Sequence, residues 1–253
     1  MSLKNKTIVI TGGGSGLGAD AARAARAAGA NVVLNGRNRD KLAAIANQID
    51  STGKHVAIVD GDIGQPETAE RLISTAADKF GGVDVLYNNA GIFGIKPLAD
   101  VTRADLDDYF NLMAGYFTVT QLAVNEMRKR GGGSIVNIGS IWSIQGIAAT
   151  PCSVPAMAKG GVHALSRSLA IELAPEKIRV NVIAPAVVET PLFDGVVSAD
   201  EMASFNAFHP LGRNGQAPDI TAAFLFLADD AQSGWITGVI LPVDGGVTAG
   251  RNA

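Results

Sequence analysis

The segment TIVITGGGSGLG, residues 7–18, determines the fold that we expect for this chain. A short β-branched run leads into five glycines, and an alanine-rich stretch over residues 19–28 follows. A strand, a glycine-rich turn and a helix in this order are typical of a unit that binds a dinucleotide. Glycine has no Cβ, so the backbone can approach a pyrophosphate closely, and the helix N-terminus attracts that anion. The alternative is a turn that is merely flexible. We predict cofactor contacts at Gly12, Gly14, Ser15, Gly16, Leu17 and Gly18.

Six more apolar, β-branched runs alternate with longer stretches rich in alanine and leucine. Because these runs are continuously apolar, the strands should be buried on both faces, as in a parallel sheet covered by helices. The pattern predicts a single doubly wound, Rossmann-type α/β domain over residues 1–253, with a seven-stranded parallel sheet. Expected strands are 7–11, 31–35, 55–59, 83–87, 134–139, 179–183 and 239–243, and expected helices lie near 16–28, 38–50, 66–80, 102–130, 154–174 and 216–228.

The composition argues against several classes of function. Hydrophobic residues make up 47% of the 253 residues, which indicates a folded globule. The formal net charge of −3 argues against nucleic acid or an anionic membrane surface as partners, because both need clustered Lys and Arg. Cys152 is the only cysteine and the three histidines are scattered, so we expect no disulfide and no metal centre. With no long apolar run and no secretory signal, we expect no membrane span and a cytoplasmic location.

The end of the second expected strand bears on the choice of cofactor. It reads Asn35-Gly36-Arg37, without the acidic residue that usually binds the ribose 2′-hydroxyl of NAD. The Arg37 guanidinium can instead pair with a 2′-phosphate, so NADP(H) is favoured and NAD(H) remains an alternative. Arg37 can also be an ordinary solvated side chain.

Further motifs follow in a fixed order along nearly the whole chain. They are Thr11–Gly18, Asp62, Asn88-Asn89-Ala90-Gly91, Asn111, Ser140, Lys159, residues 185–190, Thr237-Gly238 and residues 243–246. With these motifs the sequence resembles the short-chain dehydrogenase/reductase family. The resemblance implies a nicotinamide cofactor, hydride transfer to or from a small-molecule carbonyl or alcohol, and a homotetramer or homodimer.

The same resemblance implies further cofactor contacts. Asp62 would contact the adenine, and Thr190 would hold the nicotinamide amide or the phosphates. The family usually has Pro-Gly where this chain has Pro185-Ala186, which is a mild departure. The remaining implied contacts are Ile63, Asn89, Ala90, Gly91, Lys159, Pro185 and Val188.

The implied catalytic set lacks one member. In the family a tyrosine transfers the proton, a lysine four residues later lowers that tyrosine's pKa and binds ribose, a serine binds the substrate oxygen, and an asparagine supports a water. Ser140, Lys159 and Asn111 match, but Pro155 stands where the tyrosine is expected. Each matching residue also has a non-catalytic interpretation. The serine can be hydrogen-bonded to backbone, the lysine can be solvated at the surface, and the asparagine can be hydrogen-bonded within its helix. Proline is tolerated in a first helical turn, so we expect the fold to survive and the chemistry to suffer.

No other tyrosine is expected to replace the missing one. Tyr109 and Tyr116 flank Asn111 at roughly 200° and 140° around a helix, so we predict that both point elsewhere. Tyr87 lies in a predicted buried strand, and Cys152 lacks the reach of a phenol. We expect Ser153 to cap the helix that follows.

Residues 186–214 are predicted to cover the substrate. This stretch lacks strong periodicity and is rich in apolar residues, which favours a fairly apolar carbonyl or alcohol. Trp142 either lines that pocket or packs in the core, and His209 is expected to be structural. The sequence thus favours an NADP(H)-dependent oxidoreductase whose activity Pro155 puts in doubt. The alternatives are a cofactor-binding protein or oligomer partner without turnover, and an ordinary reductase in which Pro155 is an introduced change.

Overall fold

A computed structural model of the chain describes residues 3–148 and 150–250. Its centre is a seven-stranded sheet in the order β3-β2-β1-β4-β5-β6-β7, and each neighbouring pair of strands is parallel. The predicted doubly wound parallel sheet is confirmed. The strands are β1 (Thr7–Ile10), β2 (Asn31–Gly36), β3 (Val56–Asp60), β4 (Val85–Asn88), β5 (Gly133–Ile138), β6 (Ile178–Pro185) and β7 (Ile240–Val243).

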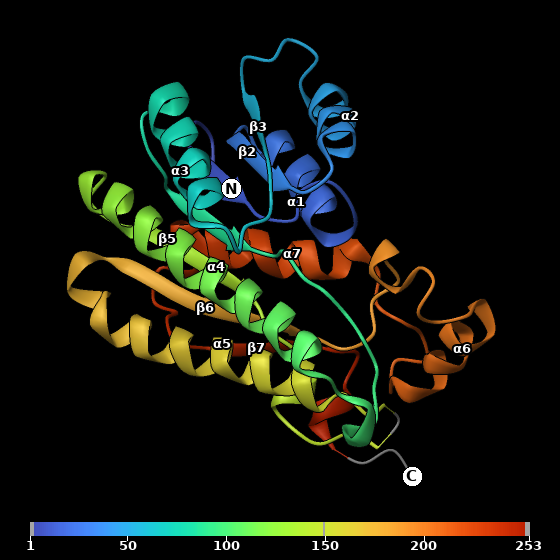
Figure 1. Cartoon of the computed structure of the whole chain (residues 1–253). Helices are drawn as coiled ribbons and strands as arrows, with labels where there is room; N and C mark the ends of the chain where they lie inside the picture. Colours follow the sequence, from blue (N-terminus) through green and yellow to red (C-terminus); the bar gives the residue numbers. More distant parts are fainter. Residues whose placement is uncertain (1–2, 149, 251–253) are drawn as a thin grey trace.

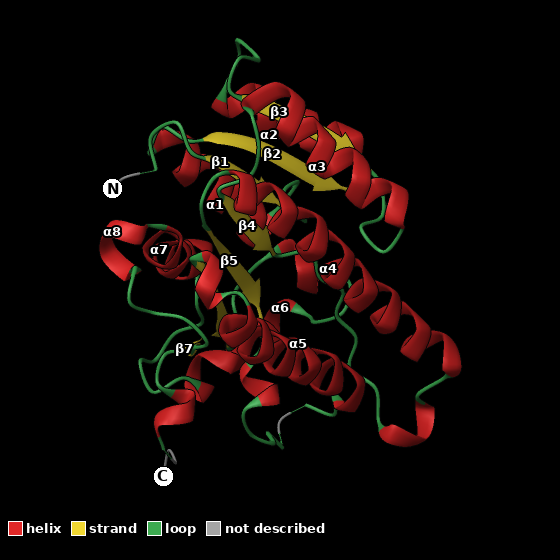
Figure 2. Cartoon of the chain, turned by 90° about the vertical axis from the view of Figure 1, so that its left-hand side faces the viewer, coloured by secondary structure: helices red, strands yellow, loops and turns green. Residues whose placement is uncertain are grey.

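Helices cover both faces of this sheet (Figure 1). One face carries α1 (Gly16–Ala27), α2 (Arg39–Ile49) and α7 (Ala217–Ala228), whose apolar side chains share a core cluster with the strands. The other face carries α3 (Pro66–Phe80), α4 (Arg103–Lys129) and α5 (Ser153–Glu172), which form a second cluster. Figure 2 shows α4 and α5 running beside one another across that second face. Burial on both sides explains why the strands are continuously apolar.

The observed bounds of the expected elements agree with the prediction to within two residues at each end. Two short helices were not expected: α6 (Ala199–Ser204) and α8 (Asp230–Ser233). The prediction that Ser153 caps α5 is wrong. The helix begins one residue earlier, so Ser153 is its first residue and Cys152 holds the cap position without a side-chain hydrogen bond.

The two central strands, β1 and β4, determine where the sheet opens into a crevice. β1 and β4 are neighbours, yet the chain leaves β1 toward one side of the sheet and β4 toward the other, which opens a crevice at their carboxyl ends. The Thr11 hydroxyl oxygen accepts hydrogen bonds from the backbone N–H groups of Asn89 and Ala90, each at 3.0 Å. These bonds join the turn after β1 to the turn after β4, so the two segments form a single rigid floor.

Candidate active site

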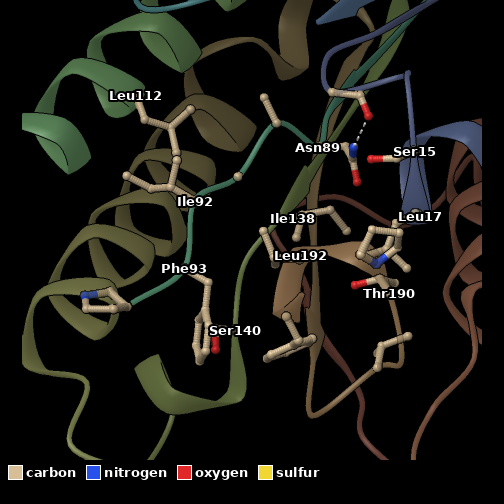
Figure 3. A pocket seen from close by; sticks show the side chains of 18 of the residues that line it. Ser15, Leu17, Asn89, Ile92, Phe93, Leu112, Ile138, Ser140, Thr190 and Leu192 are labelled. Carbon is tan, nitrogen blue, oxygen red and sulfur yellow. Dashed lines mark hydrogen bonds between the residues drawn. The ribbon is translucent and has the colours of Figure 1, made fainter. Parts of the chain in front are cut away.

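A cavity of about 810 Å³ opens at the carboxyl ends of the strands (Figure 3). Its size is within the range of cofactor and substrate pockets. Segments that lie far apart in sequence converge on it: the turn after β1, the ends of β2, β4, β5 and β6, and the side chains of α4 and α5. Of the predicted site residues, all but Gly18 line this cavity.

The glycine-rich turn presents a free helix N-terminus to the cavity. Ser15, at the cap position of α1, has an extended backbone and makes no capping hydrogen bond with its side chain, and the first turn holds no acidic residue. Gly12 has φ of +67°, and its carbonyl accepts a hydrogen bond from the Asn89 amide at 3.2 Å. Figure 3 shows Asn89 and Ser15 on the same side of the cavity. Unpaired N–H groups at a helix start suit an anion, so this turn fits a dinucleotide pyrophosphate.

Gly18 has a different role from the predicted one. It is buried, and a Cβ added there would lie 2.3 Å from the Gly12 carbonyl oxygen and 2.6 Å from the Asn89 amide nitrogen. The residue therefore lets α1 pack against its own preceding turn. It does not line the cavity, because it faces the floor rather than the ligand side.

Beyond the glycine turn, the end of β2 forms one rim of the cavity. Arg37 is exposed there, and Lys41 from the first turn of α2 lines the same rim, a basic residue that sequence reasoning missed. Neither side chain makes an ion pair among the described residues, whereas neighbouring Arg39 pairs with Asp60 at 2.6 Å. Two cations without an ion-pair partner among the described residues make this rim suited to an anion.

Asn111 lies in the cavity wall, where its side chain contacts the loop after β3. Its amide nitrogen is 3.4 Å from the Asp62 carboxylate, and a Cβ on Gly64 would lie 2.2 Å from the same nitrogen. The other Asp62 oxygen accepts the Gly64 backbone N–H at 2.9 Å. Asn111 thus holds the loop after β3, and no hydrogen bond joins it to Lys159 or Ser140 among the described residues.

Lys159 extends from α5 to the end of β5. Its Nζ donates a hydrogen bond to the Ile138 carbonyl at 2.7 Å and lies 5.2 Å from the centroid of the Tyr116 ring. Burial disfavours the charged form and lowers the pKa of Lys159 to about 8. Ser140 follows Ile138 by two residues, and its hydroxyl oxygen accepts the Trp142 backbone N–H at 3.2 Å. The ammonium and the hydroxyl therefore reach one end of the cavity from different elements.

Pro155 also lines this end, in the first turn of α5. The prediction that Tyr109 points elsewhere is wrong, whereas Tyr116 does not line the cavity and donates its hydroxyl to the Ala90 carbonyl at 2.7 Å. Tyr109 lines the cavity and its hydroxyl donates to the Ile92 carbonyl at 3.4 Å, while the Tyr116 ring lies against Lys159. The angular estimate failed because it took Asn111 to face the reacting centre. Burial raises the pKa of Tyr109 to about 12.

Apolar side chains from three loops form the rest of the wall. Phe93, after β4, packs edge-to-face on Phe193, after β6, with ring centroids 4.9 Å apart. The sequence left open whether Trp142 lines the pocket or packs in the core. It lines the cavity, and its ring nitrogen donates to the Thr150 hydroxyl at 2.6 Å. Periodicity in the sequence gave no sign of Phe93 or Thr150, because both lie in irregular loops. Lining residues not expected from the sequence include Asn38, Lys41, Ile92, Phe93, Asp108, Tyr109, Leu112 and Thr150.

A family profile described as enoyl-(acyl carrier protein) reductase matches residues 12–248. A short-chain type dehydrogenase/reductase from Mycobacterium marinum superposes with a TM-score of 0.92 at 30% identity, over 98% of this chain and 97% of that one. The chain belongs to the short-chain dehydrogenase/reductase family. This short-chain dehydrogenase/reductase is thereby an NAD(P)-dependent oxidoreductase, and small alcohols and carbonyls are the usual substrates of its relatives.

Two curated relatives of this short-chain dehydrogenase/reductase match along its length. The (2S)-[(R)-hydroxy(phenyl)methyl]succinyl-CoA dehydrogenase subunit BbsD of Thauera aromatica is 36% identical, over 97% of this chain and 98% of the relative. The trans-4-hydroxycyclohexanecarboxylate dehydrogenase of Sinomonas cyclohexanicum is 37% identical, over 98% and 94%. In residues 3–148 and 150–250, no cluster of three metal-ligating side chains occurs, and no helix is long and apolar enough to cross a membrane.

Proposed function

We propose that this protein is an NADP(H)-dependent oxidoreductase for a small, fairly apolar carbonyl or alcohol. One observation carries the proposal: a single cavity joins the open N-terminus of α1 to Lys159 and Ser140. Segments separated by more than a hundred residues build it, which indicates a site rather than an incidental groove.

The cofactor would lie along the carboxyl ends of the strands. The glycine turn would hold the pyrophosphate, and Asp62 with Ile63 would contact the adenine. Arg37 and Lys41 would pair with a 2′-phosphate, which supports NADP(H) over NAD(H). The remaining contacts that we propose are Asn89, Ala90, Gly91, Pro185, Val188 and Thr190.

When bound, the nicotinamide supplies or accepts a hydride. The residues of this chain would orient the nicotinamide and the substrate and would bind or transfer the proton. Lys159 would hold the ribose beside the nicotinamide, and the Ser140 hydroxyl would donate to the substrate oxygen. Asn111 would act by holding the Asp62 loop in place rather than by touching substrate.

The apolar wall selects the substrate. Phe93, Tyr109, Trp142 and Phe193 would surround the substrate beside Ser140, and residues 186–214 would cover it. Both relatives described above are named for substrates that carry a hydroxyl on, or next to, a six-membered carbon ring. We infer that a cyclic or aryl-substituted secondary alcohol, or the corresponding ketone, is the substrate class.

Helices α4 and α5 suggest how the chain assembles. Phe110, Phe117 and Met157 on these helices each expose about half of their surface, at 51%, 52% and 49%. Burying such side chains stabilises a contact with a second copy. We propose a homotetramer or homodimer through this face, in the cytoplasm.

The test compares NADPH with NADH. Dissociation constants from nicotinamide fluorescence should favour NADPH by at least about tenfold, and Arg37→Ala should remove that preference. A panel of cyclic and aryl ketones should be reduced with steady loss of NADPH. Pro155→Tyr should keep the NADPH affinity and raise the rate by about 10²–10⁴, the usual contribution of a placed general acid. Tighter binding of NADH contradicts the cofactor assignment.

A second candidate is a cofactor-binding subunit without turnover. Pro155 in the cavity supports it, since the side chain at the expected tyrosine position can release no proton. The Thauera aromatica relative is also named as a subunit. Steady NADPH consumption by the wild-type chain with any carbonyl excludes this candidate.

A further inference from the structure

The cavity holds few groups that can release a proton near neutral pH. The Tyr109 hydroxyl already donates to the Ile92 carbonyl, and burial raises the pKa of Tyr109 to about 12. Burial likewise raises the pKa of the Cys152 thiol. A serine hydroxyl such as that of Ser140 is a very weak acid. None of these groups is suited to give up a proton to a carbonyl oxygen.

Lys159 is in a different situation. Its Nζ donates to the Ile138 carbonyl at 2.7 Å, and one side of the ammonium faces the Tyr116 ring. An ammonium has three protons, so the Ile138 bond leaves others available. Lys159 forms no ion pair in the part of the chain that the structure describes, although it lines the cavity with Ser140 and Pro155.

Among the described residues, no negative charge lies close enough to hold the proton on this ammonium. On α5, His163 lies one turn beyond Lys159, and because burial lowers its pKa to about 4, it is neutral near pH 8 and leaves the ammonium without a charged neighbour at that position. On α4, Tyr116 donates its hydroxyl to the Ala90 carbonyl at 2.7 Å, and burial raises its pKa, so it stays neutral. The carboxylates of Asp62, Asp108 and Asp194 line the same cavity but lie beyond ion-pair distance. Burial without a carboxylate partner lowers the pKa of Lys159 to about 8.

We propose that the Lys159 ammonium itself delivers the proton to the substrate oxygen in this chain. In most of the family the corresponding proton is expected from a tyrosine, and here the chain retains only the lysine. The inference rests on the proposed oxidoreductase function and deepens it, because it assigns the acid that the site otherwise lacks.

The step balances without a further reactant. In the reductive direction the carbonyl carbon gains the hydride supplied by the bound cofactor. The π electron pair moves to the oxygen, which takes a proton from Lys159 Nζ while the N–H bond breaks. Neutral Lys159 then regains a proton from water at the cavity mouth. In the oxidative direction the neutral amine takes the alcohol proton, so the two directions need opposite protonation states of one atom.

The closing experiment crosses two substitutions and measures Lys159 directly. Lys159→Arg keeps a cation near the ribose but cannot release a proton near neutral pH. It is made in the wild-type chain and in Pro155→Tyr, where a phenol takes over as acid. If lysine is the acid, the arginine substitution lowers kcat for reduction by about 10²–10⁴ in the wild-type background and by less than about tenfold beside the tyrosine. If the lysine only positions the ribose, the arginine substitution lowers kcat by the same factor in both backgrounds, and that result overturns the proposal.

A second readout does not depend on turnover. Trace acetylation with acetic anhydride, followed by mass spectrometry of the Lys159 peptide, reports the fraction of neutral amine at each pH. We expect a midpoint near pH 8 in the protein without cofactor, and kcat for reduction falling about tenfold per pH unit above the corresponding midpoint in the complex. A labelling midpoint above about 10, the value of a free lysine, overturns the proposal. If the wild-type chain oxidises no NADPH with any ketone, the proposed function fails and the inference fails with it. If the wild-type chain does reduce a ketone, but Lys159→Arg lowers kcat by the same factor in both backgrounds, the proposed function stands and only the inference about Lys159 fails.

Discussion

The imidazole Nε2 of His163 accepts a hydrogen bond from the backbone N–H of Ser140, with 3.3 Å between the two nitrogens. A Cβ on Gly139 would lie 2.2 Å from the same Nε2, so the ring is packed directly against the end of β5. An accepting Nε2 has no proton, so the imidazole must be neutral with its proton on Nδ1. The bond ties α5 to the strand that leads into the proposed substrate-binding serine.

Stability should therefore depend on pH through His163. Burial, with the nearby Lys159 and Arg167 charges, lowers the pKa of His163 from 6.5 to about 4. Between these values the unfolded chain binds the extra proton, so the free energy of unfolding should rise with pH from 4 to 6.5. Urea unfolding at intervals across this window measures the slope. His163→Gln, whose amide oxygen can accept the Ser140 N–H without titrating, should flatten it.

His55→Gln is the matched control, because His55 is exposed and lies far along the chain from the site. It should leave most of the slope intact. Asp50 and Asp105 titrate lower, since hydrogen bonds from Thr52 and Lys96, respectively, hold their pKa values at about 2. An unchanged slope in His163→Gln would contradict the neutral-imidazole assignment.

Two glycines of the same turn should respond differently to alanine. At Gly18 a new Cβ would meet the Gly12 carbonyl oxygen at 2.3 Å, and backbone cannot move away easily. Gly18→Ala should cost about 1–3 kcal/mol of unfolding free energy, typical of overpacking. At Gly14 the nearest atom is Lys41 Cβ at 3.4 Å, so Gly14→Ala should retain stability while it weakens NADPH binding, because Gly14 lines the cavity. Thermal unfolding and fluorescence titration of both variants test this, and equal stabilities would contradict it.

The substitution Gly36→Asp should reverse the cofactor preference from NADPH to NADH. The nearest neighbour of a Cβ there is Leu42, at 3.4 Å, which is ordinary contact, so Gly36→Asp should fold normally. Its carboxylate would accept hydrogen bonds from a ribose 2′-hydroxyl and repel a 2′-phosphate. We expect the NADPH dissociation constant to rise by at least about tenfold and the NADH constant to fall. Gly36→Asn, which is similar in size and uncharged, separates the charge effect from the steric one. A loss of affinity for both cofactors would show that the residue only obstructs the site.

A buried carboxylate at the opposite end of the sheet should contribute far more to the free energy of unfolding than an exposed carboxylate. Asp84 is 6% exposed and accepts hydrogen bonds from Arg130 at 2.9 Å, Lys6 at 3.2 Å and the Thr7 backbone N–H at 2.8 Å. Asp84→Asn should cost about 1–3 kcal/mol, because an amide group replaces a fully used acceptor. Asp107→Asn breaks an exposed pair with Arg103 and should cost at most about 0.5 kcal/mol. Chemical denaturation of the two variants gives the comparison, and similar costs would contradict it.

Much of the site could be read without coordinates. The glycine turn of residues 12–18 is a local device, since its close approaches depend on missing Cβ atoms next to a strand. Asp62 and Ser140 each lie just beyond an expected strand end, and strand ends of a parallel sheet converge at one edge, whereas Lys159 lies early in an expected helix. For that reason the predicted residues, except Gly18, line one cavity.

The directions of side chains on α4 were beyond the reach of the sequence. Helical angles place Tyr109 and Tyr116 relative to Asn111, but they do not say which face of α4 meets the cavity. That face is decided by packing against α5, where Tyr109 shares a buried cluster with Val154 and Ala158. Lys41 was missed for the same reason, because its place at the rim depends on how α2 packs on the sheet.

The sequence by itself determined the doubly wound sheet, the dinucleotide turn and the absence of a phenol at position 155, because strand burial, backbone approach and residue identity are local properties. Only the tertiary structure decided what surrounds Lys159. Its desolvation and its contact with Tyr116 come from α4, α5 and β5 meeting at one point. A pKa depends on every charge and every low-dielectric surface nearby, so it belongs to that assembled environment and to no single segment of chain.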